Sequence, residues 1–75
     1  MKVIGLIQAR MGSSRLPGKV MMPLANQPLI WHIMKRLMAV EHISDVCIAT
    51  TKDEKNNVLE KFSFENNIFC YRHLE

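Results

Sequence analysis

The fold is decided by residues 3–20, which read VIGLIQARMGSSRLPGKV. Residues 3–7 form a short apolar run with β-branched side chains, which predicts a strand buried on both faces. From Ala9 to Gln27 this pattern disappears, and Gly, Ser and Pro accumulate instead. A connection of this length in a compact domain is usually functional or disordered. We therefore expect the functional site to follow the first strand directly.

The remaining chain alternates between helical and strand patterns. Pro28 opens a predicted helix that runs to Ala39, with Asn26 or Gln27 as its N-cap. Its apolar residues recur at helical spacing, which indicates one buried face. Residues 44–50 then predict a second buried strand.

A second helix and a third strand complete the pattern. Thr51 and Glu54 have the spacing of a capping box, so we expect a helix that begins there and runs to about Asn66. Asn67 is predicted to end it in the left-handed conformation, and residues 68–71 predict the third strand. The order indicates an α/β fold, βαβαβ with a parallel sheet.

One face of this sheet is expected to lie open. Right-handed crossovers that step the same way place both helices on one face, and large exposed apolar patches are rare on soluble monomers. We therefore expect residues 1–75 to be part of a larger single domain, with a homodimer that covers the open face as the alternative. Leu74 and Glu75 are candidates for cloning residues.

Composition excludes several classes of protein. Hydrophobic residues make up 48% and charged residues 23%, as in ordinary globular proteins. No apolar run approaches the roughly 20 residues that span a membrane, and no signal cleavage site is recognisable. Cys47 and Cys70 are far apart and are expected to be free thiols. The sequence predicts a cytoplasmic protein.

The net charge of +3 is distributed unevenly. Residues 1–40 contain six Lys and Arg residues and no Asp or Glu. Residues 41–75 contain four Lys and Arg residues and seven Asp and Glu residues. A cationic first half attracts an anionic partner. The candidates are a nucleoside triphosphate, a nucleic acid and an acidic protein surface.

The connection after the first strand leaves the carboxyl end of that strand, which is where open α/β sheets bind ligands. Its residue types are also those of an anion-binding site. Gly12 permits close backbone approach and positive φ, and consecutive amides with the hydroxyls of Ser13 and Ser14 can form an anion-binding nest. Three cations surround this nest: Arg10, Arg15 and Lys19.

The pattern differs from two familiar nucleotide motifs. Pro17-Gly18 is typical of a type II turn that would return Lys19 toward Arg15. Five residues separate Gly12 from Gly18, and Val20 follows the lysine, so a Walker A loop is disfavoured. The dinucleotide fingerprint G-x-G-x-x-G is absent as well.

At these residues the chain resembles a known family. Residues 3–20, followed by Pro23-Leu24 and residues 27–30, resemble the opening of the cytidylyltransferases, which include CMP-KDO and CMP-sialic acid synthetases. Ala49-Thr50-Thr51 also fits. The likeness is greatest to the spore-coat polysaccharide biosynthesis protein F branch, because the synthetases usually have Pro at the position of Gln8.

The resemblance implies a function and a complete fold. A sugar oxygen would attack the α-phosphorus of CTP, release pyrophosphate and form a CMP-sugar for surface or spore-coat polysaccharide. The chain would be the Rossmann-like, nucleotide-binding half of a nucleotide-diphospho-sugar transferase fold, which has three layers in the full-length protein. By itself this part is expected to be inactive.

The resemblance also assigns residues. Arg15 and Lys19 are the catalytic candidates on the triphosphate, and the remaining nucleotide-binding candidates are Gln8, Ala9, Arg10, Gly12, Ser13 and Ser14. The backbone of Gln8 and Ala9 would lie beside the base. The family's Mg²⁺ is held by acidic residues that we expect outside this chain, since Asp45 and Asp53 are isolated.

Two other functions remain open. A non-catalytic module that binds an anion or a partner would be stable and complete at this length. A nucleic-acid binder is disfavoured, because the bases cluster in one loop without aromatic residues for stacking. His32, His42 and His73 have no spacing suited to a metal or a catalytic pair, so we expect surface or core histidines.

Overall fold

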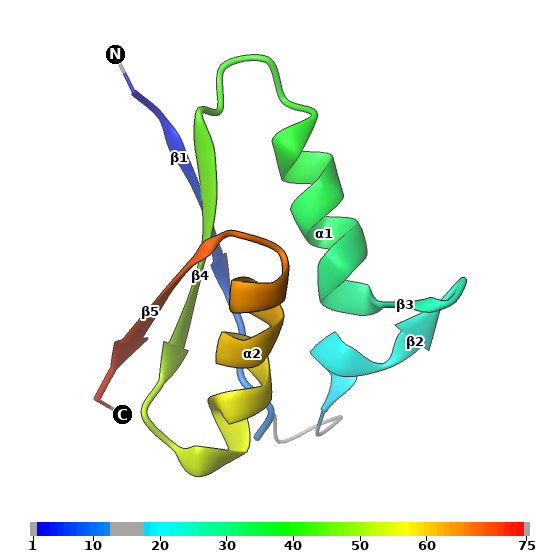
Figure 1. Cartoon of the computed structure of the whole chain (residues 1–75), viewed down its shortest axis with the longest axis vertical. Coiled ribbons are helices and arrows are strands. Elements are labelled where there is room, and N and C mark those ends of the chain that lie inside the picture. Colours follow the sequence, from blue (N-terminus) through cyan, green and yellow to red (C-terminus); the bar gives the residue numbers. More distant parts are fainter. Residues whose placement is uncertain (1, 13–17, 75) are drawn as a thin grey trace.

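The computed structural model describes residues 2–12 and 18–74, which form a sheet with two helices packed on one side of it (Figure 1). This confirms the predicted α/β fold. In chain order the elements are β1 (Ile4–Gln8), the 3-10 helix η1 (Lys19–Met21), β2 (Pro23–Leu24), β3 (Gln27–Pro28), α1 (Leu29–Met38), β4 (Asp45–Thr51), the 3-10 helix η2 (Glu54–Asn56), α2 (Asn57–Glu65) and β5 (Phe69–His73).

The main sheet has the strand order β1-β4-β5, and all of its pairs are parallel. The central strand β4 pairs with β1 from Ile4 opposite Asp45, and with β5 from Cys47 opposite Phe69. Parallel neighbours need a crossover, and the two helices supply it. The carboxyl ends of all three strands therefore meet at one edge of the sheet.

The core lies between this sheet and the two helices. Its largest fully buried apolar side chains come from α1, β4 and α2, and they are Ile30, Met34, Ile48 and Leu59. The apolar periodicity of each helix faces the sheet, as the sequence predicts. Among the described residues no helix is long and apolar enough to cross a membrane.

The other face of the sheet is uncovered. Four of its apolar side chains expose more than half of their surface, namely Ile4, Leu6, Phe69 and Tyr71. We call this set the open face. It confirms the expectation that both crossovers step the same way and leave one apolar face without a layer.

The two cysteines lie on opposite faces of the sheet, and this makes them reporters of the open face. Cys47 lies between Leu6 and Phe69 in register, whereas Cys70 packs against the core. Burial raises the pKa of the Cys70 thiol, so less of it is thiolate at a given pH. We expect iodoacetamide to alkylate Cys47 several times faster than Cys70, as measured by mass spectrometry of digested peptides. Equal rates, or faster labelling of Cys70, would show that the open face is covered in solution.

The predicted start of the second helix is wrong. Thr51 remains in β4, where it pairs with His73, and the cap of the following turn is Asp53, whose side chain accepts a hydrogen bond from the Lys55 amide at 2.9 Å. The helix α2 begins only at Asn57. Its predicted end is confirmed, because Asn67 has a φ of 58°.

The N-cap predicted for α1 is also wrong, because a small hairpin precedes this helix. Asn26 has a φ of 70° in the turn between β2 and β3, and Gln27 belongs to β3. Pro28 occupies the cap position without a side-chain hydrogen bond. The turn needs a residue that tolerates the left-handed region, which Asn does better than most.

Candidate functional site

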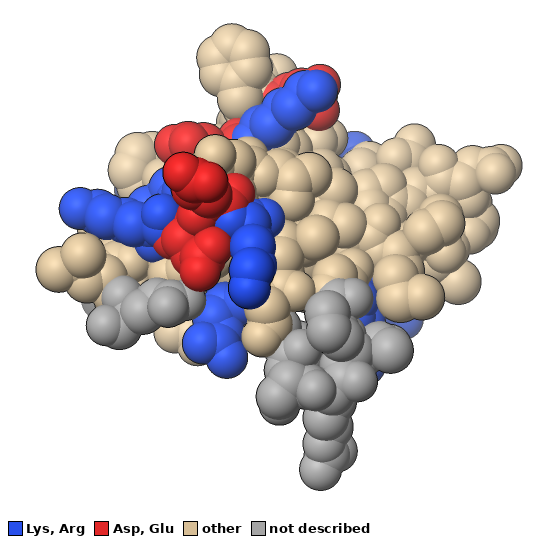
Figure 2. All heavy atoms as spheres, turned by 90° about the horizontal axis from the view of Figure 1, so that it is seen from below, with Lys and Arg blue, Asp and Glu red and all other residues tan. Residues whose placement is uncertain are grey.

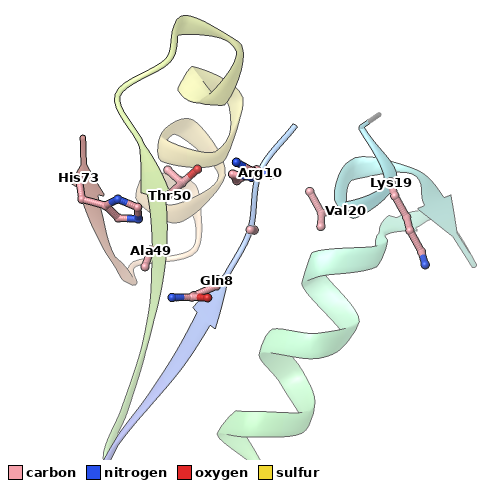
Figure 3. A pocket seen from close by; sticks show the side chains of 8 residues that line it. Gln8, Arg10, Lys19, Val20, Ala49, Thr50 and His73 are labelled. Atoms are coloured by element: carbon pink, nitrogen blue, oxygen red, sulfur yellow. The ribbon is translucent and has the colours of Figure 1, made fainter. Parts of the chain in front are cut away.

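A pocket of about 590 Å³ lies where the carboxyl ends of the three parallel strands meet. We call it the edge pocket (Figure 3). It is lined from β1 and its extension, η1, β4 and β5 by Gln8, Ala9, Arg10, Lys19, Val20, Ala49, Thr50 and His73. This is the position at which open α/β sheets bind ligands. Four of the predicted site residues thus lie in one pocket: Gln8, Ala9, Arg10 and Lys19.

The floor of the edge pocket is backbone and small side chains. The Ala9 amide donates a hydrogen bond to the Ala49 carbonyl at 3.0 Å, which continues the β1–β4 pairing beyond the end of β1. Both alanines are buried. The pairing of β1 with β4 therefore extends into the lining of the edge pocket.

The connection after β1 is closed at its ends. The Gly18 amide donates a hydrogen bond to the Met11 carbonyl at 2.8 Å. Gly18 has a φ of 75° and a ψ of 9°, a conformation that favours glycine. The expected positive φ belongs to Gly18 and not to Gly12, because Gly12 stays outside the left-handed region.

The cations of the site stand at two sides of the edge pocket. Arg10 follows β1, and Lys19 begins η1 and extends away from the strand ends (Figure 3). Both side chains are exposed, and neither forms an ion pair within residues 2–12 and 18–74. The predicted residues Ser13, Ser14 and Arg15, and Pro17 of the predicted turn, lie outside the described residues.

A second hollow of about 250 Å³ adjoins Arg10, and we call it the side hollow. It is lined by Arg10, Gly12, Asp53, Lys55 and Asn56. The carboxylate of Asp53 lies in the same hollow as Arg10, so folding brings an acid to the cationic first half of the chain. Figure 2, which views this edge of the sheet, shows Asp and Glu side chains between Lys and Arg side chains.

Two polar residues of the edge pocket were not predicted as site residues, although Thr50 belongs to the segment Ala49-Thr50-Thr51 that resembles the family. Thr50 is 1% exposed, and its hydroxyl has no hydrogen-bond partner among the described atoms. His73 ends β5 opposite Thr51, and its ring is stacked on Tyr71 with 6.0 Å between centroids. We expected a surface or core histidine there. Only the strand register, which spacing along the chain does not reveal, places it at the pocket.

The described residues contain no group of three His, Cys, Asp or Glu side chains that could hold a metal ion. Asp45 lies at the other end of β4, 3.7 Å from the Lys2 ammonium, and one oxygen of Asp53 accepts the Lys55 amide.

Comparisons with known proteins show which family the chain resembles. A model of the family described as "Cytidylyltransferase" matches residues 4–74. The chain is 39% identical, over 83% of its length, to an 8-amino-3,8-dideoxy-manno-octulosonate cytidylyltransferase of Shewanella halifaxensis. It is 34% identical, over 81% of its length, to a 3-deoxy-manno-octulosonate cytidylyltransferase of Escherichia coli. The chain covers 25% of each of these two relatives.

Solved structures show the same likeness. A cytidylyltransferase of Leptospira borgpetersenii superposes with a TM-score of 0.85 at 31% identity, over 97% of this chain and 31% of that one. A CMP:2-keto-3-deoxy-manno-octonic acid synthetase complexed with CTP superposes with a TM-score of 0.73 at 29% identity, over 96% of this chain and 28% of that one. The chain thus spans about a quarter of the length of its curated relatives.

Proposed function

Because the chain belongs to the cytidylyltransferase family, we propose that it binds CTP at the edge pocket for the transfer of CMP to a sugar acid. The observation that carries this proposal is that Gln8, Arg10 and Lys19 line one pocket at the carboxyl edge of the sheet. The synthetase that was solved with CTP has a similar sequence and fold over nearly the whole chain. Its bound nucleotide supports CTP as the ligand here.

The proposed reaction needs positioning and charge more than a covalent nucleophile. A hydroxyl oxygen of the sugar forms a bond to the α-phosphorus of CTP, and the bond from this phosphorus to the bridging oxygen breaks. Pyrophosphate leaves with the bonding electrons, and the hydroxyl proton passes to solvent. Arg10 and Lys19, as fixed cations at two sides of the pocket, would stabilise the charge that develops on the leaving pyrophosphate.

The other roles follow from the layout of the pocket. The backbone of Gln8 and Ala9 forms the wall that would lie beside the base. The unpaired hydroxyl of Thr50 supports a polar ligand, because a buried hydroxyl without a partner is costly. Gly12, Ser13, Ser14 and Arg15 are proposed to bind the triphosphate. Mg²⁺ is proposed to be held by acidic residues that lie outside this chain.

The acceptor is proposed from the relatives. The names of the two curated relatives specify eight-carbon sugar acids, which favours an acceptor of that class. Gln8 supports the finer proposal of the spore-coat branch, whose acceptor would differ. These two proposals for the acceptor are distinguished by an assay of CTP-dependent pyrophosphate release. The assay uses a protein that contains this chain and a panel of sugar acids and neutral sugars.

We further propose that residues 1–75 are the N-terminal part of one larger, three-layer domain. The open face supports this, because a second layer of helices would bury its apolar side chains. A homodimer through the open face is the alternative. Sedimentation of the chain across a range of concentrations separates them, since only the dimer dissociates on dilution.

The proposal is tested by calorimetric titration of the chain with CTP, ATP and inorganic tripolyphosphate, with and without Mg²⁺. We expect CTP and tripolyphosphate to bind, and CTP to bind more tightly than ATP because the base lies against the backbone of Gln8 and Ala9. Binding of every polyanion with equal affinity would favour a non-catalytic anion-binding module. Failure of the folded chain to bind any of them would refute nucleotide binding by this chain on its own.

A further inference from the structure

A buried asparagine joins the two sequence segments that build the site. Asn56 is 2% exposed at the end of η2, and its side-chain oxygen accepts a hydrogen bond from the Met11 amide at 2.8 Å. Its side-chain nitrogen donates to the Thr51 hydroxyl oxygen at 2.7 Å. The Asn56 side chain therefore links Met11, just after β1, to Thr51 at the end of β4.

The orientation of this amide group is determined by its partners. The Met11 backbone nitrogen has a hydrogen and donates only, so it must face the oxygen of the Asn56 side chain. The nitrogen of the side chain then faces Thr51, whose hydroxyl oxygen also accepts the Asp53 amide at 3.3 Å. Both the oxygen and the nitrogen of the Asn56 side chain are hydrogen-bonded. An apolar side chain of similar shape could form neither of these hydrogen bonds.

The Asn56 side chain holds Met11, whose carbonyl closes the connection after β1 by accepting a hydrogen bond from Gly18. Met11 is held on both sides of its backbone, since its amide donates to Asn56 and its carbonyl accepts the Gly18 amide. Lys19 follows Gly18 directly, and Arg10 precedes Met11. The position of both cations of the edge pocket thus depends on where Met11 is held.

We propose that Asn56 is a positioning residue for the nucleotide: by holding Met11, it fixes Met11 and Gly18, which flank the triphosphate-binding residues, relative to the strand ends that would contact the base. This inference rests on the proposed function. Asn56 borders the side hollow and not the edge pocket, so it acts through Met11 and does not itself contact the base. Substitution should weaken recognition of phosphates in particular.

The test uses Asn56→Leu, which removes both hydrogen bonds and keeps the branched shape of the side chain, and two comparison variants. Asn56→Asp retains an acceptor for the Met11 amide. Ser63→Ala removes another buried hydrogen bond of α2, to the Leu59 carbonyl at 2.9 Å, away from both the edge pocket and the side hollow. The two readouts are the dissociation constant for tripolyphosphate and CTP and the hydrogen-exchange rates of the Met11 and Gly18 amides.

We expect Asn56→Leu to bind both ligands about tenfold more weakly and to lose protection of the Met11 amide. In Asn56→Asp this amide should stay protected. Ser63→Ala should lower the unfolding midpoint but bind the ligands as the native chain does. Native affinity in Asn56→Leu, or an equal loss in Ser63→Ala, would overturn the positioning role. If the native chain binds neither ligand, the proposed function fails and this inference falls with it.

Discussion

Replacing Arg10 and Lys19 together by alanine is expected to weaken the binding of CTP about 100-fold. Each hydrogen bond between a charged side chain and a phosphate contributes about 1.5–3 kcal/mol, and two bonds at the lower value correspond to roughly two decades in the dissociation constant. The two cations stand at separate sides of the edge pocket, so neither can replace the other. Calorimetric titration at physiological salt measures the loss.

The matched control removes two cations elsewhere. Arg36→Ala with Lys61→Ala changes the net charge equally, and these exposed residues of α1 and α2 line neither the edge pocket nor the side hollow. Charges beyond about 8 Å are largely screened at physiological salt, so this control should bind CTP as the native chain does. Equal losses in both variants would mean that net charge, and not the pocket, attracts the nucleotide. Adding Arg15→Ala to the Arg10→Ala, Lys19→Ala variant tests the predicted role of Arg15, which lies between these two residues in the sequence.

Leu59→Ala is expected to bring the chain close to unfolding. Leu59 is fully buried, with 0% exposed, and its truncation should cost about 3 kcal/mol. A chain of this length has a free energy of unfolding of roughly 4–11 kcal/mol, and the open face contributes little burial to it. The thermal midpoint should fall by more than about 10 °C, as measured by circular dichroism.

The comparison for this prediction is the same substitution at an exposed leucine. Leu24 is 54% exposed in β2, so Leu24→Ala should change the free energy of unfolding by less than about 0.5 kcal/mol. A Leu59→Ala chain as stable as the native one would mean that α2 is not held by its apolar face. Both variants should be studied in the same denaturant series, where a constant slope shows that only stability has changed.

The main elements of the fold were predictable because burial leaves a periodic trace in the sequence. The strand around Ile48 is continuously apolar, and Leu59 and Phe62 recur at helical spacing. The hairpin of β2 and β3 was not predictable from periodicity, because two-residue strands are too short to have any. Thr51 was misread as a helix cap because its pairing with His73, which keeps it in β4, is a long-range contact.

Some residues of the candidate site were predictable from the sequence, and others were not. Gln8, Arg10 and Lys19 lie within one local motif, and its composition indicates an anion site without knowledge of the fold. His73 and Asn56 come from segments far along the chain, and each reaches the site only through strand pairing or a tertiary hydrogen bond. No spacing rule predicts such residues. The roles of Ser13, Ser14 and Arg15 remain predictions.

The central position of β4 in the sheet determines the order in which the chain can acquire structure. Within residues 2–12 and 18–74, β1 pairs only with β4, about forty residues later, and β5 also pairs only with β4. Closing such a loop costs entropy before any contact is gained, which makes parallel pairing slow. As the chain leaves the ribosome, β1 and the connection after it must wait unpaired until β4 has been synthesised. Folding is therefore expected to start around β4 and α2, with β1 and the nucleotide site added last.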